Sequence, residues 1–185
     1  MRETKSKYAI LGMLSIEPMS GYDIKKRVEE SISNFWTESY GQIYPILKGL
    51  VAEKLVTKTT EKNPGKPDRH VYALTEGGRG ELRRWLGEGV TPKAERNELL
   101  LKIFFGEEVT LATNVAHVEQ YRELQRGLLD RYKAIEKQLK AEHAGNSNLP
   151  YWLLTVSYGQ HVTQALLDWC DEALAKLNRM AKRGK

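Results

Sequence analysis

The segment from Ser39 to Leu50 constrains the fold of this chain most, because it carries a complete helical signature. Ser39 and Gln42 have the spacing of a capping box, in which two side chains satisfy the first free amides of a helix. Apolar residues then recur at i, i+3, i+4 and i+7, namely Ile43, Ile46, Leu47 and Leu50. This pattern predicts a helix with one buried stripe and an exposed polar face. That face carries Tyr40, Gln42, Tyr44, Pro45 and Lys48.

The elements around this helix follow the order helix, helix, turn, helix and hairpin. Apolar spacing from Tyr8 to Leu14 predicts a first short helix, and Ser20 with Asp23 forms a capping box that begins the second. The predicted buried side of the second helix consists of Tyr22, Ile24, Val28 and Ile32. Two strand-like segments, 56–61 and 70–74, flank the basic, turn-rich loop 62–69. The order is that of a winged helix-turn-helix with a small β-hairpin wing.

A winged helix-turn-helix binds DNA by placing one helix in the major groove while the wing contacts the backbone or minor groove. Gln42 has the amide that pairs with adenine, and Lys48 reaches guanine or phosphate. Helix N-termini also favour phosphate, which brings Ser39 into the set. The predicted DNA contacts are Ser39, Tyr40, Gln42, Tyr44 and Lys48 on the helix and Lys62, Lys66, Arg69 and His70 on the wing. The alternative is a winged-helix module that docks another protein and does not bind DNA.

Net charge is +5, and the excess lies in the first half of the chain. Residues 1–96 carry 17 Lys and Arg against 13 Asp and Glu, a difference of +4, whereas the other 89 carry 12 against 11. A basic first half indicates a polyanionic partner such as double-stranded DNA.

The second half is predicted to be all helical, which makes the fold class mainly α. The boundary is placed at a linker, residues 88–96, between a DNA-binding domain (1–87) and a helical dimerisation domain (97–185). A long helix from Thr110 to about Glu142 has a mean apolar spacing of 3.5 residues, the period of coiled coils. A last helix, opened by Pro150, repeats apolar residues every seven positions.

Two helices of this length cannot bury all of their apolar faces against each other, so the sequence predicts a homodimer. The dimerisation seam is assigned to Val156, Thr163, Leu167, Cys170, Leu174 and Leu177.

Several classes of function are excluded by what the sequence lacks. One cysteine, Cys170, allows neither an internal disulfide nor a multi-cysteine zinc site, and the histidines lack a second ligand at metal spacing. No glycine spacing fits a phosphate or dinucleotide loop, and no nucleophile–base set is apparent. No apolar run reaches the ~20 residues of a membrane span, and no signal peptide is recognised. The chain is therefore expected to be a cytoplasmic protein without catalytic residues, metal or cofactor.

The motifs of residues 8–86 resemble those of the PadR family of bacterial transcription regulators. They are Ser20-Gly21-Tyr22-Asp23, Tyr40-Gly41-Gln42-Ile43-Tyr44-Pro45 and Tyr72-Ala73-Leu74-Thr75. The remainder is similar to the longer PadR subfamily in length and helix order. The resemblance implies a homodimer with a winged-helix head and a helical dimerisation domain. It also implies a repressor that releases DNA when a small molecule, often an aromatic compound, binds.

The effector site is the least readable part of the sequence. Aromatic rings on the last helix are able to stack on an aromatic effector, with a histidine as hydrogen-bond partner. The candidates are Trp152, Tyr158, His161 and Trp169. Aromatic residues at helical spacing more often belong to a core, so the choice between an effector site and core packing stays open. Cys170, on the seam, is expected to be a small buried hydrophobe and not a redox sensor.

Overall fold

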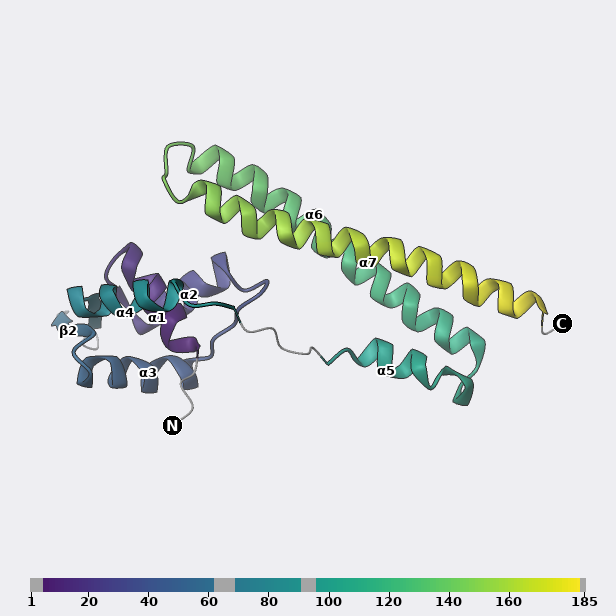
Figure 1. The fold of residues 1–185 in the computed structure, drawn as a ribbon, viewed down its shortest axis with the longest axis horizontal. Coiled ribbons are helices and arrows are strands. Elements are labelled where there is room, and N and C mark those ends of the chain that lie inside the picture. Colours follow the sequence, from purple (N-terminus) through teal and green to yellow (C-terminus); the bar gives the residue numbers. More distant parts are fainter. Residues whose placement is uncertain (1–4, 62–68, 91–95, 184–185) are drawn as a thin grey trace. The chain divides into compact units, whose positions relative to one another are not determined.

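The computed structural model describes residues 5–61, 69–90 and 96–183, and it divides the chain into two compact units, residues 1–92 and 93–185 (Figure 1). The first unit contains four helices and three strands in the described residues. They are α1 (Ser6–Ile16), β1 (Met19–Ser20), α2 (Gly21–Ser31), α3 (Tyr40–Ala52), β2 (Val56–Glu61), β3 (Arg69–Leu74) and α4 (Glu76–Leu86). The predicted winged-helix fold, mainly α with a small hairpin, is confirmed.

Capping side chains begin α2, as the sequence predicts, and also α4. Ser20 accepts the Asp23 N–H while the Asp23 carboxylate accepts the Ser20 N–H, so both halves of the capping box at α2 are present. Thr75 accepts the Gly78 N–H at 2.9 Å and begins α4. These contacts satisfy amides that have no partner inside a helix.

The three strands form one antiparallel sheet in the order β1-β3-β2. The hairpin pairs Val56 with Leu74 and Glu61 with Arg69 at its two ends. Met19 pairs with Tyr72 as part of β1, a strand that the sequence analysis does not predict. A two-residue strand is too short to show alternation, which is why this edge of the sheet was not predicted.

The core of the first unit joins α1, α2 and α3, with Ile10, Ile24, Ile43 and Leu47 fully buried. The prediction that Tyr22 belongs to the buried side of α2 is wrong, since 60% of its surface is exposed. The buried positions Gly21, Ile24 and Val28 lie three or four residues apart, and Tyr22 falls off that face.

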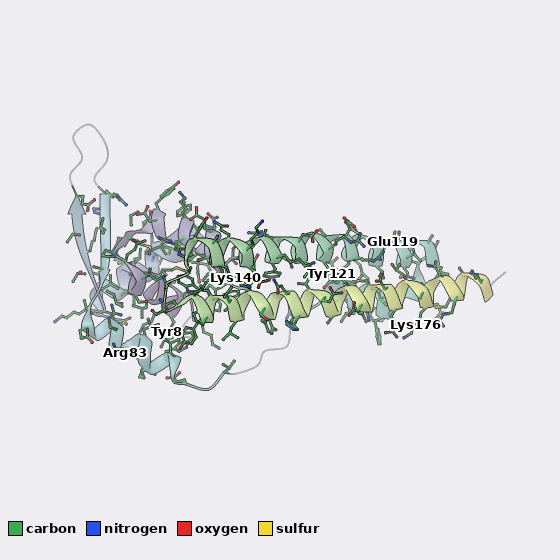
Figure 2. All side chains as sticks on the ribbon, turned by 90° about the horizontal axis from the view of Figure 1, so that it is seen from above. Tyr8, Arg83, Glu119, Tyr121, Lys140 and Lys176 are labelled. Carbon is green, nitrogen blue, oxygen red and sulfur yellow. The ribbon has the colours of Figure 1, made fainter. Side chains whose placement is uncertain are left out.

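The second unit is a short helix followed by a long helical hairpin. Its elements are α5 (Glu98–Phe104), a 3-10 turn η1 (Gly106–Glu108), α6 (Leu111–Glu142) and α7 (Leu149–Arg183). Figure 2 shows α6 and α7 side by side, with side chains between them. Gln160 donates to Glu136 at 2.8 Å, and Arg122 pairs with Asp171 at 2.7 Å, so contacts join the helices at well-separated levels. Across the described residues, no helix is long and apolar enough to cross a membrane.

The seven-residue repeat of α7 faces α6 of the same chain. Val156, Thr163 and Cys170 are buried within a single chain, and the neighbouring Gly159 lies so close to the Tyr132 ring that a Cβ would meet it at 2.3 Å. Cys170 is fully buried inside this hairpin, near Tyr121. Burial raises the pKa of its thiol. α6 of the same chain covers these three residues, and their assignment with the other seam residues to a dimer interface stays a prediction. The remaining seam residues, Leu167, Leu174 and Leu177, are half-buried.

Candidate DNA-binding site

Helix α3 lies along the lower edge of the first unit in Figure 1. Its predicted polar face is exposed to solvent. Ile43, Leu47 and Leu50 anchor its inner side in the core. The outer side is exposed at every predicted contact residue: Ser39, Tyr40, Gln42, Tyr44 and Lys48. A helix anchored in this way holds its outer side chains in fixed relative positions, as docking in the major groove requires.

Gln42 is already engaged at the start of this helix. Its Oε1 accepts the Ser39 N–H at 2.9 Å and the Ser39 hydroxyl at 2.8 Å. A bidentate contact with adenine uses both the oxygen and the NH2 group of a glutamine. In the free protein the oxygen is committed to the helix cap, so the NH2 group is the part that remains to face a base.

A row of three tyrosine rings runs from α2 onto α3. Tyr22 and Tyr40 lie 6.4 Å apart between ring centroids, as do Tyr40 and Tyr44, and both pairs are close to parallel. All three rings are exposed. Tyr22 was not predicted as a contact residue. Its position outside the buried face of α2, which consists of Gly21, Ile24 and Val28, could have indicated that it is exposed.

The absence of a side chain at Gly21 allows Tyr44 to lie against the start of α2. A Cβ at Gly21 would stand 2.7 Å from Cε1 of the Tyr44 ring, closer than real contacts allow. The two elements of the helix-turn-helix are therefore fitted to each other at this point.

Pro45 lies inside α3, and the helix continues through it from Tyr40 to Ala52. Proline has no N–H, so it cannot donate to the carbonyl of Gly41 four residues earlier. That carbonyl belongs to the first turn of α3, between the exposed residues Tyr40 and Gln42. Pro45, a residue that is unusual inside a helix, thus lies on the face of α3 that is predicted to contact DNA.

The root of the wing is joined to the start of α2 by an ion pair. Arg69 Nη2 donates to Asp23 Oδ2 at 2.6 Å. Burial raises the pKa of Asp23, but the hydrogen bonds from Ser20 and Arg69 outweigh it, and the pKa lies below its ordinary value. The neighbouring His70 contacts the Thr60 hydroxyl across the hairpin at 3.1 Å. Lys62 and Lys66, predicted at the wing tip, lie outside the described residues.

The surface therefore combines hydroxyls, an amide and cations on two adjoining elements. Tyr22, Tyr40 and Tyr44 supply hydroxyls and ring faces, while Lys48 and Arg69 supply positive charge. Hydroxyls and cations of this kind contact phosphates, and an amide on a helix reads base edges. The chemistry fits a nucleic-acid surface.

The predicted effector residues are not gathered into one site. Trp152 packs edge-on against the His143 ring at 5.3 Å, near the turn between α6 and α7. Tyr158 is 72% exposed, and the ring of His161 bonds to the Ser157 carbonyl of its own helix at 2.8 Å. Trp169 follows Tyr158 by eleven residues on the same helix, a rise of about 16 Å.

A hollow of about 350 Å³ lies elsewhere in this unit, between α5, η1 and α6. Its lining includes Leu101, Phe105 and Val109, with His117 at one side, and it includes none of the predicted effector residues.

Both halves of the chain match known protein families. Residues 10–84 match the transcriptional regulator PadR-like family, and residues 95–178 match the family described as virulence activator alpha C-term. The probable transcriptional regulator Rv1176c of Mycobacterium tuberculosis is 29% identical over 92% of this chain and 96% of its own length. The negative transcriptional regulator PadR of Bacillus subtilis is 39% identical over 54% of this chain and 55% of its own length.

Solved structures extend the likeness over nearly the whole chain. Bacillus subtilis PadR in complex with operator DNA has a TM-score of 0.83 at 26% identity, and the match covers 94% of this chain and 99% of that one. The same regulator in complex with p-coumaric acid has a TM-score of 0.75 at 25% identity, covering 93% and 94%. The winged helix and its sequence motifs thus agree with the comparisons, and residues 10–84 form a domain of the PadR-like family of transcriptional regulators.

Proposed function

We propose that this regulator binds specific DNA through the exposed face of α3 and the wing, and that it acts as a repressor. The observation that carries the proposal is the continuous polar surface from Tyr22 over Tyr40 and Tyr44 to Lys48, beside the wing-root arginine. The operator complex of PadR supports a DNA target, and the name negative regulator given to that relative supports repression. A DNA target also places the protein in the compartment of the chromosome, the cytoplasm of a bacterium.

The test is binding to the DNA upstream of the protein's own gene, against an excess of unrelated competitor, at two salt concentrations. Affinity should fall as salt rises, because each neutralised phosphate releases counterions. Lys48→Ala should weaken binding, whereas Lys133→Ala, an exposed lysine of α6, should leave it unchanged. A response independent of salt, with Lys48→Ala equal to wild type, would instead support the alternative of a module that docks proteins.

The functional unit is proposed to be a homodimer, assembled through an apolar surface on α5 and the residues after it. We refer to it as the α5 patch, and it consists of Leu100, Leu101, Phe104, Phe105 and Val109, all exposed in the single chain. Monomeric proteins rarely expose so many adjacent large apolar side chains. Phe104, 80% exposed, projects beside the hollow lined by Leu101 and Phe105. A projection and a hollow on one surface suit a two-fold contact between identical copies.

Two such subunits would place their recognition helices about 34 Å apart over a palindromic operator, one turn of DNA. The α5 patch is thus proposed as the interface, and the predicted α7 seam is the alternative.

The regulator is also proposed to respond to a small aromatic acid. The p-coumaric acid complex of PadR supports this, since that relative shares the fold of both units. Trp152, Tyr158, His161 and Trp169 stay predicted contacts, although their spread along α7 means that a ligand would meet a subset of them. Adding p-coumarate to the protein–DNA complex should release the DNA, whereas acetate at the same concentration should not.

A further inference from the structure

A second hollow, of about 260 Å³, lies beside the tyrosine row in the first unit. The first residues of α2 form one wall, Tyr44 of α3 forms another, and Arg69, His70 and Tyr72 of β3 close the remaining side. This wing-root hollow is distinct from the face of α3 that points outward, because its lining comes from three elements.

Tyr72 is the buried polar group of this hollow. The residue is 7% exposed, and its hydroxyl has no hydrogen-bond partner within residues 5–61, 69–90 and 96–183. Burial, and then the nearby Tyr44, raise the pKa of Tyr72, so the hydroxyl stays protonated and remains a donor at neutral pH. The hydroxyl is not among the buried side-chain atoms that lack a partner, so it reaches the open space of the hollow, where a ligand can accept its hydrogen bond.

The backbone explains why the hollow is open at this point. Residues 70, 72 and 74 lie on one face of β3, and this row leads from the core at Leu74 out to His70 at the rim. Gly21 offers no side chain to fill the space, and the Tyr44 ring rests against it. The hollow is therefore built by the fold and not by one mobile side chain.

Hydrogen-bond donors surround the space. Tyr22, Tyr44 and Tyr72, each with a hydroxyl, line the hollow together with Arg69. One guanidinium nitrogen of Arg69 donates to Asp23, and the two opposite charges offset each other. The other guanidinium N–H groups remain available as donors. The Asp23 N–H is bound to the Ser20 hydroxyl, whereas the Gly21 and Tyr22 amides before it have no acceptor inside the helix and favour an anion at this end.

We propose that the wing-root hollow binds a phosphodiester group of the DNA backbone, with the Tyr72 hydroxyl as a donor. The proposal rests on the DNA binding proposed above and assigns a second contact region to it. A phosphate there would fix the register of the duplex against α3 without reading its sequence. A free phosphate ion offers the same acceptor oxygens, so the experiment must distinguish the two sources.

The test uses Tyr72→Phe, which removes one hydroxyl and keeps the ring, in the full-length protein. Binding is measured by fluorescence anisotropy with two labelled duplexes of about two helical turns, one rich in A·T pairs and one rich in G·C pairs. The variant should bind both duplexes about three- to tenfold more weakly than wild type, by an equal factor, because every duplex offers the same phosphates. Tyr151→Phe, an exposed tyrosine of α7, is the matched control and should bind as wild type.

Gly21→Ala is the second variant, because the added Cβ meets the Tyr44 ring and narrows the hollow. It should weaken binding to both duplexes as Tyr72→Phe does. Thermal melts of each variant establish that the proteins compared are folded. Affinity of Tyr72→Phe within twofold of wild type would overturn the proposal, and so would a loss confined to one duplex, which indicates a base contact.

Inorganic phosphate separates the two sources of the ligand. Exchange of chloride for phosphate, without DNA, should shift the melting temperatures of wild type and Tyr72→Phe equally. Stabilisation of wild type alone would assign the hollow to a free anion and overturn a DNA contact.

The variants also separate this proposal from the proposed function. If Tyr72→Phe binds DNA as wild type while Lys48→Ala binds more weakly, the proposed phosphate contact in the hollow is wrong and the proposed DNA binding stands. If neither variant differs and binding ignores salt, the proposed function itself fails.

Discussion

Asp23 and Arg69 lie 46 residues apart in the chain, and a 2.6 Å ion pair joins the start of α2 to the root of the wing. The same carboxylate accepts the Ser20 N–H at 3.0 Å, so one side chain both caps a helix and holds the wing arginine. This carboxylate thus adds a side-chain link to the strand pairing that already joins the start of α2 to the wing. Surface ion pairs contribute little stability alone, so the main effect of this one is on position.

Neutralising that carboxylate is expected to make DNA binding more sensitive to salt. In Asp23→Asn the guanidinium of Arg69 is freed to neutralise a phosphate, and the slope of log affinity against log salt should steepen by up to ~0.9. Loss of the N3 carboxylate should also lower the free energy of unfolding by ~0.5–2 kcal/mol. Asp130→Asn, an exposed change of equal charge in the second unit, is the control. Equal slopes for the two variants would contradict the expectation.

The two roles of Gln42 are separable by substitution. Gln42→Glu keeps an acceptor for the Ser39 N–H, as in the usual capping box, but it loses the NH2 donors and adds negative charge. It should therefore retain wild-type unfolding free energy and lose DNA affinity by ~1–3 kcal/mol. Gln42→Ala should lose both affinity and ~0.5–2 kcal/mol of stability. Chemical denaturation and DNA titration measure the two effects, and Gln42→Glu with unaltered affinity would remove Gln42 from the contact set.

Two glycines of α4 are expected to respond oppositely to the same change. A Cβ at Gly78 would stand 2.1 Å from the backbone carbonyl oxygen of Leu55, so Gly78→Ala should destabilise the fold by about 2 kcal/mol or more. Gly80 has open space at that position, and Gly80→Ala should stabilise the helix by ~0.5–1 kcal/mol. Urea denaturation of both variants measures the difference. A stable Gly78→Ala would mean that the contact between α4 and Leu55 is looser than described.

The α5 patch leads to a prediction for the oligomeric state. Phe104→Glu places a charge at the most exposed ring of the patch and should give monomers in sedimentation equilibrium. Leu154→Glu, at an exposed leucine of α7 outside the patch, should leave the dimer intact. The reverse result would place the interface on α7. Monomeric wild-type protein would refute the proposed dimer altogether.

Stability should fall in acid because of a cluster that joins α1 to α4. The hydrogen bond from Arg84, aided by Tyr8 and by the charges of Lys7 and Arg84, lowers the pKa of Glu81 to about 2, although burial opposes this. A carboxylate whose pKa is depressed on folding stabilises the protein above its unfolded pKa, near 4.5, and loses that contribution as pH falls toward 2. Melting temperature should therefore drop over this range. Glu81→Gln should show a smaller drop, and an equal drop in both proteins would assign the acid sensitivity to other groups.

The sequence predicts those parts of the fold that local rules determine. Ser20 with Asp23, and Thr75 with Gly78, set helix starts within four residues, and the hairpin follows from alternation around a turn-rich loop. The outer face of α3 was also predictable, because an apolar stripe defines its opposite side.

Features that depend on distant parts of the chain could not be predicted. The Asp23–Arg69 pair, the stacking of Tyr22 on Tyr40 and the pairing of Met19 with Tyr72 have no signature in local spacing. The repeat in α7 indicates a packed face, but the period is the same whether α6 or a second chain covers it. The burial of Cys170 within one chain decides between these cases for that residue.

The contact between Gly21 and Tyr44 has a consequence for how such sequences diverge. A side chain at position 21 and a large ring at position 44 compete for the same volume, so neither position varies freely while the other is retained. Descendants that gain a β-carbon at position 21 should carry a smaller residue at position 44, and a large-to-small change at 44 should precede it. The two motifs that contain these residues should therefore change together, although positions 21 and 44 lie 23 residues apart in the chain.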